Sequence, residues 1–176
     1  MAQISTVLHV LSVGVFVIAL LYAAISDVRT LEIANWIPVT IILAFLPAAI
    51  LSGIPGTSIA IHYGTALIIF SGGAILFTKG LAGGGDVKFL AAVCAWWNLE
   101  QLGRYLVAVA LLGGVLGLIA ILASRMDRIR RLVPWLEEGD TMKQPVPYGI
   151  AIAGGALIMF DTLPVLPDLF VNLLGE

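Results

Sequence analysis

Long apolar runs separated by short polar segments dominate the pattern of the chain. An α-helix rises about 1.5 Å per residue, so roughly 20 apolar residues are needed to cross about 30 Å of hydrocarbon. Five runs meet or approach that length, and the last is interrupted by Pro164 and Pro167: 7–25, 37–51, 59–77, 105–123 and 148–174. The pattern therefore predicts an all-α membrane protein.

A sixth run, residues 87–97, covers only about half a bilayer, and on its own it could be a re-entrant or interfacial segment. The loop charges favour a crossing helix extended to residue 102. In that case Arg104 alone lies outside, and one side holds the other basic residues: Arg29, Lys79, Lys88, Arg125, Arg128, Arg130, Arg131 and Lys143. By the positive-inside rule this side is cytoplasmic. We therefore predict one membrane domain, residues 1–176, with six transmembrane helices and both termini on the outer, periplasmic side.

Residues near the predicted span ends fit a membrane boundary. Aromatic side chains there are typical of an interfacial belt: Trp36, Trp96, Trp97, Trp135 and Tyr148. The segment 124–146 alternates basic and apolar residues, which favours a cytoplasmic amphipathic helix on anionic lipid over a substrate-binding role. Gly113 and Gly117 form a small-xxx-small pair suited to close helix packing.

Composition narrows the chemistry. Hydrophobic residues make up 60% of the chain and charged residues 11%, against about 25% charged in a soluble protein. There is no basic stripe for nucleic acid. The chain has one cysteine, Cys94, and two histidines, His9 and His62. These are too few ligands for a typical thiolate or histidine metal site. We expect no metal and no organic cofactor.

Two aspartates stand apart from the other acidic residues. Asp27 ends the first predicted span, and Asp86 follows Gly83-Gly84-Gly85 and opens the fourth, so both fall on the predicted cytoplasmic face. Charged residues at such depth are candidates for function because their burial is costly. Structural alternatives exist: Asp86 could cap its helix, the glycines could form an ordinary turn, and Asp27 could pair with Arg29.

A pair of carboxylates suits peptide hydrolysis. Two carboxyl groups held close together tend to share one proton, so the ionised member can activate water while the protonated member donates to a carbonyl. The start of a helix beside Asp86 favours the ionised form there. Successive glycines let a substrate backbone approach closely.

At these positions the chain resembles the type IV prepilin peptidases, which are GxGD membrane aspartic proteases. Gly83-Gly84-Gly85-Asp86 resembles the GxGD motif, and Asp27-Val28-Arg29 with Ile33-Ala34-Asn35 resembles the first aspartate segment, where Ala34 replaces the usual proline. Pro147-Tyr148-Gly149 resembles a later Pro-aromatic-Gly motif. The short form is most similar to the peptidases of tight-adherence (Flp) pilus systems.

The resemblance implies a multi-pass peptidase of the bacterial inner membrane. It would remove the short basic leader of a prepilin or pseudopilin at the cytoplasmic face and could act with the pilus assembly machinery. It assigns Asp27 and Asp86 as the catalytic pair, and it implies supporting or substrate-binding roles for Gly83, Gly85, Lys88, Arg29, Glu32, Asn35, Pro147, Tyr148 and Gly149. Because the first span begins near Met1 and Cys94 lies within the membrane, we expect no N-methyltransferase activity.

Two other functions are compatible with the pattern. A small proton- or cation-coupled transporter could use the two aspartates as a relay, but it would place them near the midplane and would tend to show inverted repeats. A non-catalytic assembly subunit would use the glycines only for packing and would tolerate Asp→Asn substitutions.

Overall fold

The computed structural model describes residues 2–124 and 146–166, and within these ranges every regular element is a helix. The helices are α1 (Ala2–Thr30), α2 (Trp36–Leu51), α3 (Gly56–Thr78), α4 (Gly84–Cys94), α5 (Leu99–Ser124) and α7 (Gly149–Ile158), with a short 3₁₀ helix, η2 (Phe160–Thr162). The predicted all-α class is confirmed for this part of the chain.

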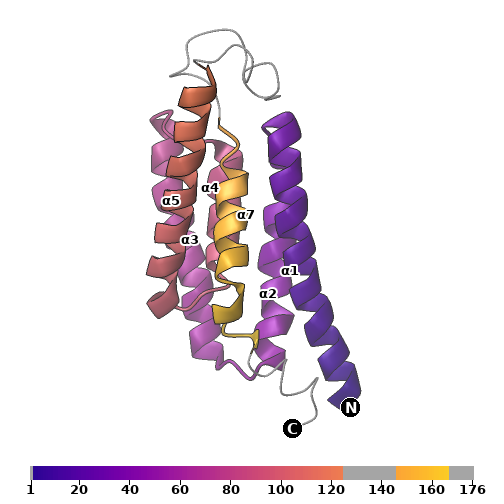
Figure 1. Cartoon of the computed structure of the whole chain (residues 1–176). Helices are drawn as coiled ribbons and strands as arrows, with labels where there is room; N and C mark the ends of the chain where they lie inside the picture. The colour runs from indigo at the N-terminus through magenta and orange to yellow at the C-terminus, as the bar shows by residue number, and fades with distance from the viewer. Residues whose placement is uncertain (1, 125–145, 167–176) are drawn as a thin grey trace.

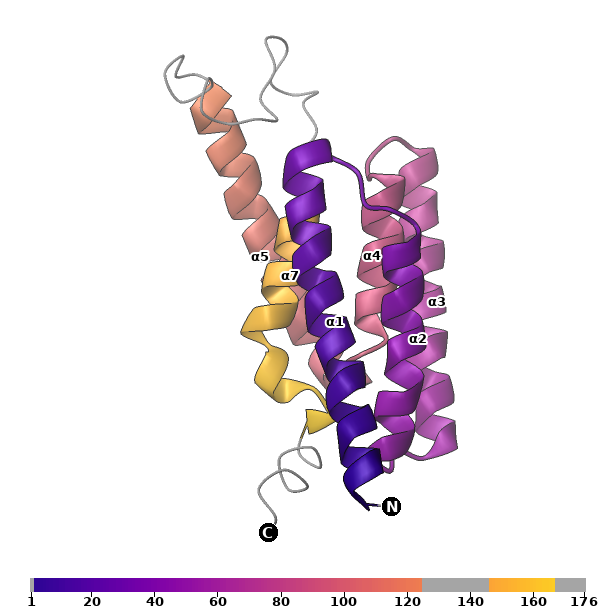
Figure 2. The same ribbon diagram turned by 90° about the vertical axis from the view of Figure 1, so that its right-hand side faces the viewer.

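Successive helices run in opposite directions and form one elongated bundle (Figure 1, Figure 2). α1 packs against α2 and α7, α3 packs against α4, and α5 packs against α7. α4 lies inside the bundle and contacts α2, α3 and α7. At the upper end of the bundle in Figure 1, α1 and α3 end while α2, α4 and α7 begin. The sequence segments around Asp27, Asp86 and Tyr148 are therefore brought to the same end.

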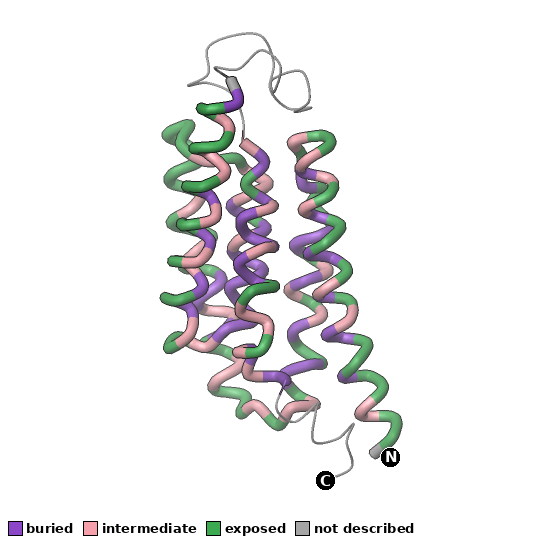
Figure 3. Tube along the Cα trace, viewed as in Figure 1, coloured by how far each residue is buried: buried purple, intermediate pink, exposed green. Residues whose placement is uncertain are grey.

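The bundle has the surface of a membrane protein. α1, α3 and α5 are long and apolar enough to cross a bilayer, and α2 and α7 are shorter apolar helices. Their outward faces carry exposed large apolar residues, including Ile18, Ile68 and Leu111, while α4 and α7 are largely buried (Figure 3). Water would penalise such a surface, and lipid does not. The count of six spans and the side of the termini stay predictions.

The boundary between the fourth and fifth helices differs from the prediction. The predicted fourth segment, 87–102, contains α4 only up to Cys94, and α5 begins at Leu99. Asn98 caps the new helix: its side-chain oxygen accepts the backbone N–H of Gln101 at 3.0 Å and so satisfies a free donor at the start of α5. The predicted sixth segment, 148–174, is also interrupted, because α7 ends at Ile158. Residues 125–145, most of the predicted amphipathic segment, and residues 167–176 lie outside the described part.

Trp96 and Trp97 were predicted to lie in an interfacial belt, and this is wrong. Both are buried, because they fill the space left in the bundle where α4 ends early. Trp96 stacks on Phe16 with ring centroids 4.0 Å apart, and Trp97 stacks on Tyr105 at 4.4 Å. Their indole N–H groups donate to the Ile41 carbonyl and to the Thr162 hydroxyl, so burial leaves neither donor unsatisfied. Trp36 is exposed on the bundle surface, and Trp135 lies outside the described residues.

Candidate active site

Asp27 lies in the last turn of α1 and is 4% exposed. The chain then turns sharply at Leu31, whose φ of 54° is unusual for a residue with a branched side chain. The N–H of Leu31 still donates to the Asp27 carbonyl at 2.9 Å, so the turn closes the helix directly after the aspartate. Ile33 follows and is buried. The loop therefore fixes the Asp27 side chain at the upper end of the bundle.

The N-terminus of α7 holds the Asp27 carboxyl group. The backbone N–H of Gly149 donates to Asp27 Oδ2 at 2.6 Å. A Cβ at position 149 would lie 2.8 Å from the same oxygen and 3.1 Å from Cδ1 of Ile33, so only glycine permits this approach without displacement. Tyr148 is the N-cap residue of α7, and Pro147 precedes it. The Pro-Tyr-Gly segment thus supplies a helix start that faces Asp27.

Asp86 lies in the first turn of α4, and the preceding glycines set its position. Gly83 is the N-cap residue, and a Cβ there would come within 2.6 Å of Asp86 Oδ2. A Cβ at Gly85 would meet Cβ of Ile33 at 3.4 Å and its backbone N at 3.5 Å. Gly85 thus brings α4 close to the loop that follows Asp27. Of the three glycines, Gly83 is the one whose Cβ would collide with the Asp86 carboxyl group, whereas a Cβ at Gly85 would make ordinary contacts with Ile33.

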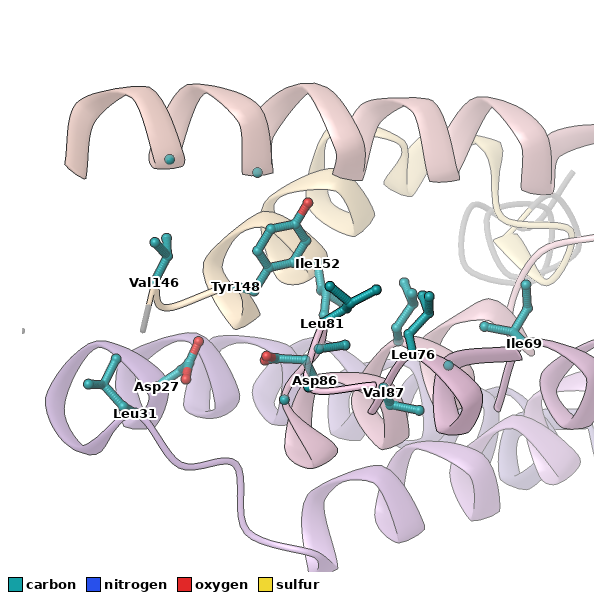
Figure 4. A pocket seen from close by; sticks show the side chains of 17 residues that line it. Asp27, Leu31, Ile69, Leu76, Leu81, Asp86, Val87, Val146, Tyr148 and Ile152 are labelled. Carbon is teal, nitrogen blue, oxygen red and sulfur yellow. The ribbon is translucent and has the colours of Figure 1, made fainter. Parts of the chain in front are cut away.

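Both aspartates line one cavity of about 770 Å³ at the upper end of the bundle. Figure 4 shows the Asp86 carboxyl group directed toward Asp27, with both groups facing the space below α5. Tyr148 and Gly83 also line this cavity. Residues far apart in sequence, from α1, α4 and α7, are therefore assembled around one chamber.

Four of the predicted supporting residues lie apart from this cavity. Lys88 Nζ donates to Asn35 Oδ1 at 2.7 Å, and both residues line a separate groove between α2, α3 and α4. Arg29 lies beside a shallow apolar depression near Ile150. Glu32 has an exposed side chain, and its backbone carbonyl accepts the Ser26 and Thr30 hydroxyls. Pro147, Gly85 and Gly149 do not line the cavity either, although Gly149 donates to Asp27 and Gly85 lies against Ile33.

The charge preference at the site differs from the one predicted. The sequence placed the helix start beside Asp86 and so favoured the ionised form there. In the structure, Asp27 accepts a backbone hydrogen bond at the start of α7, and such a bond favours the ionised carboxylate. Asp86 lies half-buried across the cavity and faces the charge of Asp27. This arrangement suits one ionised and one protonated carboxyl group.

Most of the cavity wall is apolar, and sequence reasoning did not find it. The residues that line it and were not predicted to belong to the site are Leu31, Ile69, Gly73, Leu76, Gly80, Leu81, Ala82, Val87, Leu90, Gly113, Gly117, Val146 and Ile152. Gly113 and Gly117 had been noticed as a helix-packing pair, and the rest carry no sequence signal. Within residues 2–124 and 146–166, no three His, Cys, Asp or Glu side chains form a group that could hold a metal.

Comparison with known proteins assigns the chain to a family. The sequence model of the type IV leader peptidase family matches residues 14–122, which is more than half of the chain and includes both aspartates. The chain belongs to the type IV leader peptidase family. It is also 26% identical over 147 residues to a "Prepilin leader peptidase/N-methyltransferase" of Bacillus subtilis (strain 168).

That alignment covers 83% of this chain and 53% of the relative, so the chain spans about half the length of the curated relative that it matches. No solved structure matches the chain significantly. Within this leader peptidase family member, the matched region covers α1 to α5 and thus holds Asp27 and Asp86, whereas the Pro-Tyr-Gly segment at 147–149 follows it.

Proposed function

We propose that this chain is an aspartic endopeptidase that removes the short basic leader of Flp-like type IV prepilins or pseudopilins. The observation that supports this most directly is the convergence of Asp27 and Asp86 on one cavity. A proton or cation relay fits less well, because Asp27 ends α1 and Asp86 begins α4 at the same end of the bundle. A purely structural role would not explain glycines that make room for carboxylate oxygens.

The two carboxyl groups divide the chemistry between them. Ionised Asp27 takes a proton from a water molecule, and the resulting nucleophile attacks the carbonyl carbon of the scissile peptide bond. Protonated Asp86 donates its proton to the carbonyl oxygen, which gives a neutral tetrahedral diol. As the diol collapses, the proton held by Asp27 passes to the leaving amine and Asp86 recovers its proton from the diol hydroxyl. The C–N bond breaks and both aspartates return to their starting states.

The basic residues support a cytoplasmic location for the site. Arg29 lies in the last turn of α1 and Lys79 directly follows α3, and both of these helices end at the upper end of the bundle. Lys88 lies near the start of α4, which begins at that end. Arg104 lies near the start of α5, toward the other end. The positive-inside rule then favours an upper end that faces the cytoplasm, with six spans in the bacterial inner membrane.

The basic leader of the substrate would contact the exposed polar residues at the upper end of the bundle. Glu32 is exposed on the loop between α1 and α2, where its negative charge could attract a basic leader. The pilus assembly machinery is a further partner under this proposal, through the prepilin. We confine the proposal to the peptidase step, because two carboxyl groups facing one cavity suit peptide hydrolysis.

The test is leader removal from a prepilin co-expressed with the wild type, with Asp27→Asn or with Asp86→Asn. Each substitution is expected to reduce processing by at least about 100-fold while the protein still inserts, because general acid–base catalysis needs both groups. Asp161→Asn is the matched control, since Asp161 is exposed in η2 at the opposite end of the bundle. Wild-type processing by a well-expressed Asp27→Asn or Asp86→Asn variant would remove that residue from the mechanism. The mass of the mature N-terminus would show whether a methyl group is added.

A further inference from the structure

A second space, of about 520 Å³, lies between α2 and α3, and the residues that line it differ from those of the catalytic cavity. α2 and α3 both pack on α4 but make little contact with each other, so a groove stays open between them. Ala91 and Ala92 of α4 form its base, and their short side chains leave it deep. In Figure 2 these three helices lie together on the side of the bundle away from α5.

The walls of this groove are apolar and face the surrounding lipid. Val39 of α2 and Leu67 of α3 both line it with exposed side chains. At the lower end, the Tyr63 hydroxyl donates to the Ile42 carbonyl at 3.0 Å and so joins α3 to α2. Asn35 lines the upper end, and the seven residue steps from Asn35 to Ile42 correspond to about 10 Å along α2. The groove is thus an apolar slot that is bridged below and covers about one third of the hydrocarbon core.

Two polar side chains at the upper end of the groove offer hydrogen-bond donors. Lys88 Nζ donates to Asn35 Oδ1 at 2.7 Å, and this bond engages the amide oxygen, the only acceptor atom of the two side chains. The groups that remain are the other ammonium N–H bonds of Lys88 and the amide NH₂ of Asn35, and both side chains are exposed. A positive charge beside an amide donor suits an anion with several acceptor oxygens, such as a phosphate.

Trp36 indicates the depth of this polar end in the bilayer. It directly follows Asn35 and is exposed at the start of α2. Exposed tryptophans of membrane proteins concentrate at the level of the lipid headgroups. Asn35 and Lys88 therefore lie near that level, and the apolar slot extends from them into the hydrocarbon.

We propose that this groove binds one anionic phospholipid, with its phosphate on Lys88 and Asn35 and one acyl chain in the slot between α2 and α3. The lipid fits both parts of the groove, because it joins a negatively charged headgroup to an apolar chain. The proposed substrate fits less well, since its leader is basic and the charge of Lys88 would repel it. Bound there, the lipid would fill the space that α2 and α3 leave open on α4.

Native mass spectrometry of the full chain in a neutral detergent tests the site, with phosphatidylglycerol and phosphatidylcholine of identical acyl chains as competing probes. The wild type should retain one phosphatidylglycerol with a preference of at least about fivefold, the contribution of one lysine at an anionic headgroup. Lys88→Met should abolish this preference, and Lys88→Arg should keep it. Lys79→Met is the matched control, because Lys79 is exposed at the same end of the bundle but does not line the groove. Equal retention of both lipids by the wild type, or an equal loss in Lys79→Met, would overturn the site.

A second measurement separates the lipid from other occupants. Glycerol 1-phosphate carries the phosphate without acyl chains, and in large excess it should leave phosphatidylglycerol bound to the wild type. Displacement of the lipid by glycerol 1-phosphate would indicate a site for free phosphate and would refute a role for the slot. Displacement by prepilin, or by a second copy of the chain, would assign the groove to a polypeptide instead. None of these readouts depends on leader removal, so their failure would leave the peptidase assignment intact.

Discussion

Replacement of Gly149 by alanine tests the most specific contact in the site. The added Cβ would lie 2.8 Å from Oδ2 of Asp27, 3.1 Å from its Cβ and 3.1 Å from Cδ1 of Ile33. These atoms belong to the buried end of α1 and its loop, so they have little room to move. The carboxyl group must shift, and its 2.6 Å hydrogen bond from the Gly149 N–H is lost or weakened.

The size of the effect follows from that bond. A hydrogen bond to a charged acceptor contributes about 1.5–3 kcal/mol, and each 1.4 kcal/mol changes a rate by about tenfold. Gly149→Ala should therefore lower kcat for leader removal by roughly 10- to 100-fold. Stability should change less, because alanine at the first residue of α7 recovers up to about 1 kcal/mol of helix propensity.

The assay measures cleavage of purified prepilin by the purified variant in detergent, with thermal unfolding followed by circular dichroism. Gly154→Ala is the control on the same helix, since its Cβ would meet only Cδ1 of Leu112, the end of a flexible side chain, at 3.3 Å. A Gly149→Ala variant with wild-type kcat would refute the reasoning that α7 positions Asp27. Equal losses in both variants would point to a general defect of α7 instead.

Three further outcomes are expected. Gly83→Ala should lower kcat by at least about 10-fold, because its Cβ would lie 2.6 Å from Asp86 Oδ2, whereas Gly72→Ala, in open space on α3, should not. The pH profile of kcat/KM should be bell-shaped, because acid protonates both carboxyl groups and removes the base, and alkali ionises both and removes the acid; a monotonic profile would contradict a shared proton. Lys88→Met, which breaks the exposed bond to Asn35, should cost less than about 1 kcal/mol in thermal unfolding and leave kcat within about threefold of wild type; a larger loss of kcat would place Lys88 in the site.

The sequence predicted the main elements of the site because chemistry and hydropathy restrict them strongly. Apolar run lengths located the long helices, and loop charges predicted that Asp27 and Asp86 share one face. The structure brings both residues to one cavity. The glycines before Asp86 stood out in the sequence, and the family resemblance added Gly149. At Gly83 and Gly149 the structure gives the reason, because a Cβ there would collide with a carboxylate oxygen.

The apolar features escaped prediction because hydropathy cannot tell a lipid-facing residue from one that lines a cavity or fills the core. Leu76 lines the cavity and Trp96 is buried in the core, yet both are residue types that also occur on a membrane-facing surface. The boundary after α4 could have been found, since Asn98 followed three residues later by Gln101 is a recognisable helix start. The loop charges had instead favoured one span that continued to residue 102.

The short length of α4 is the feature that allows the site to form. With 11 residues, α4 is about 16 Å long, so a helix that begins level with Asp27 must end inside the bundle. A helix end in an apolar interior leaves carbonyl groups that need donors. His62 on α3 meets this need, because its Nδ1–H donates to the Ala95 carbonyl at 2.8 Å. Phe45 packs against the rings of both His62 and Trp96 in the buried core. α4 can thus end at depth with its carbonyl satisfied, while its N-terminus holds Asp86 opposite Asp27.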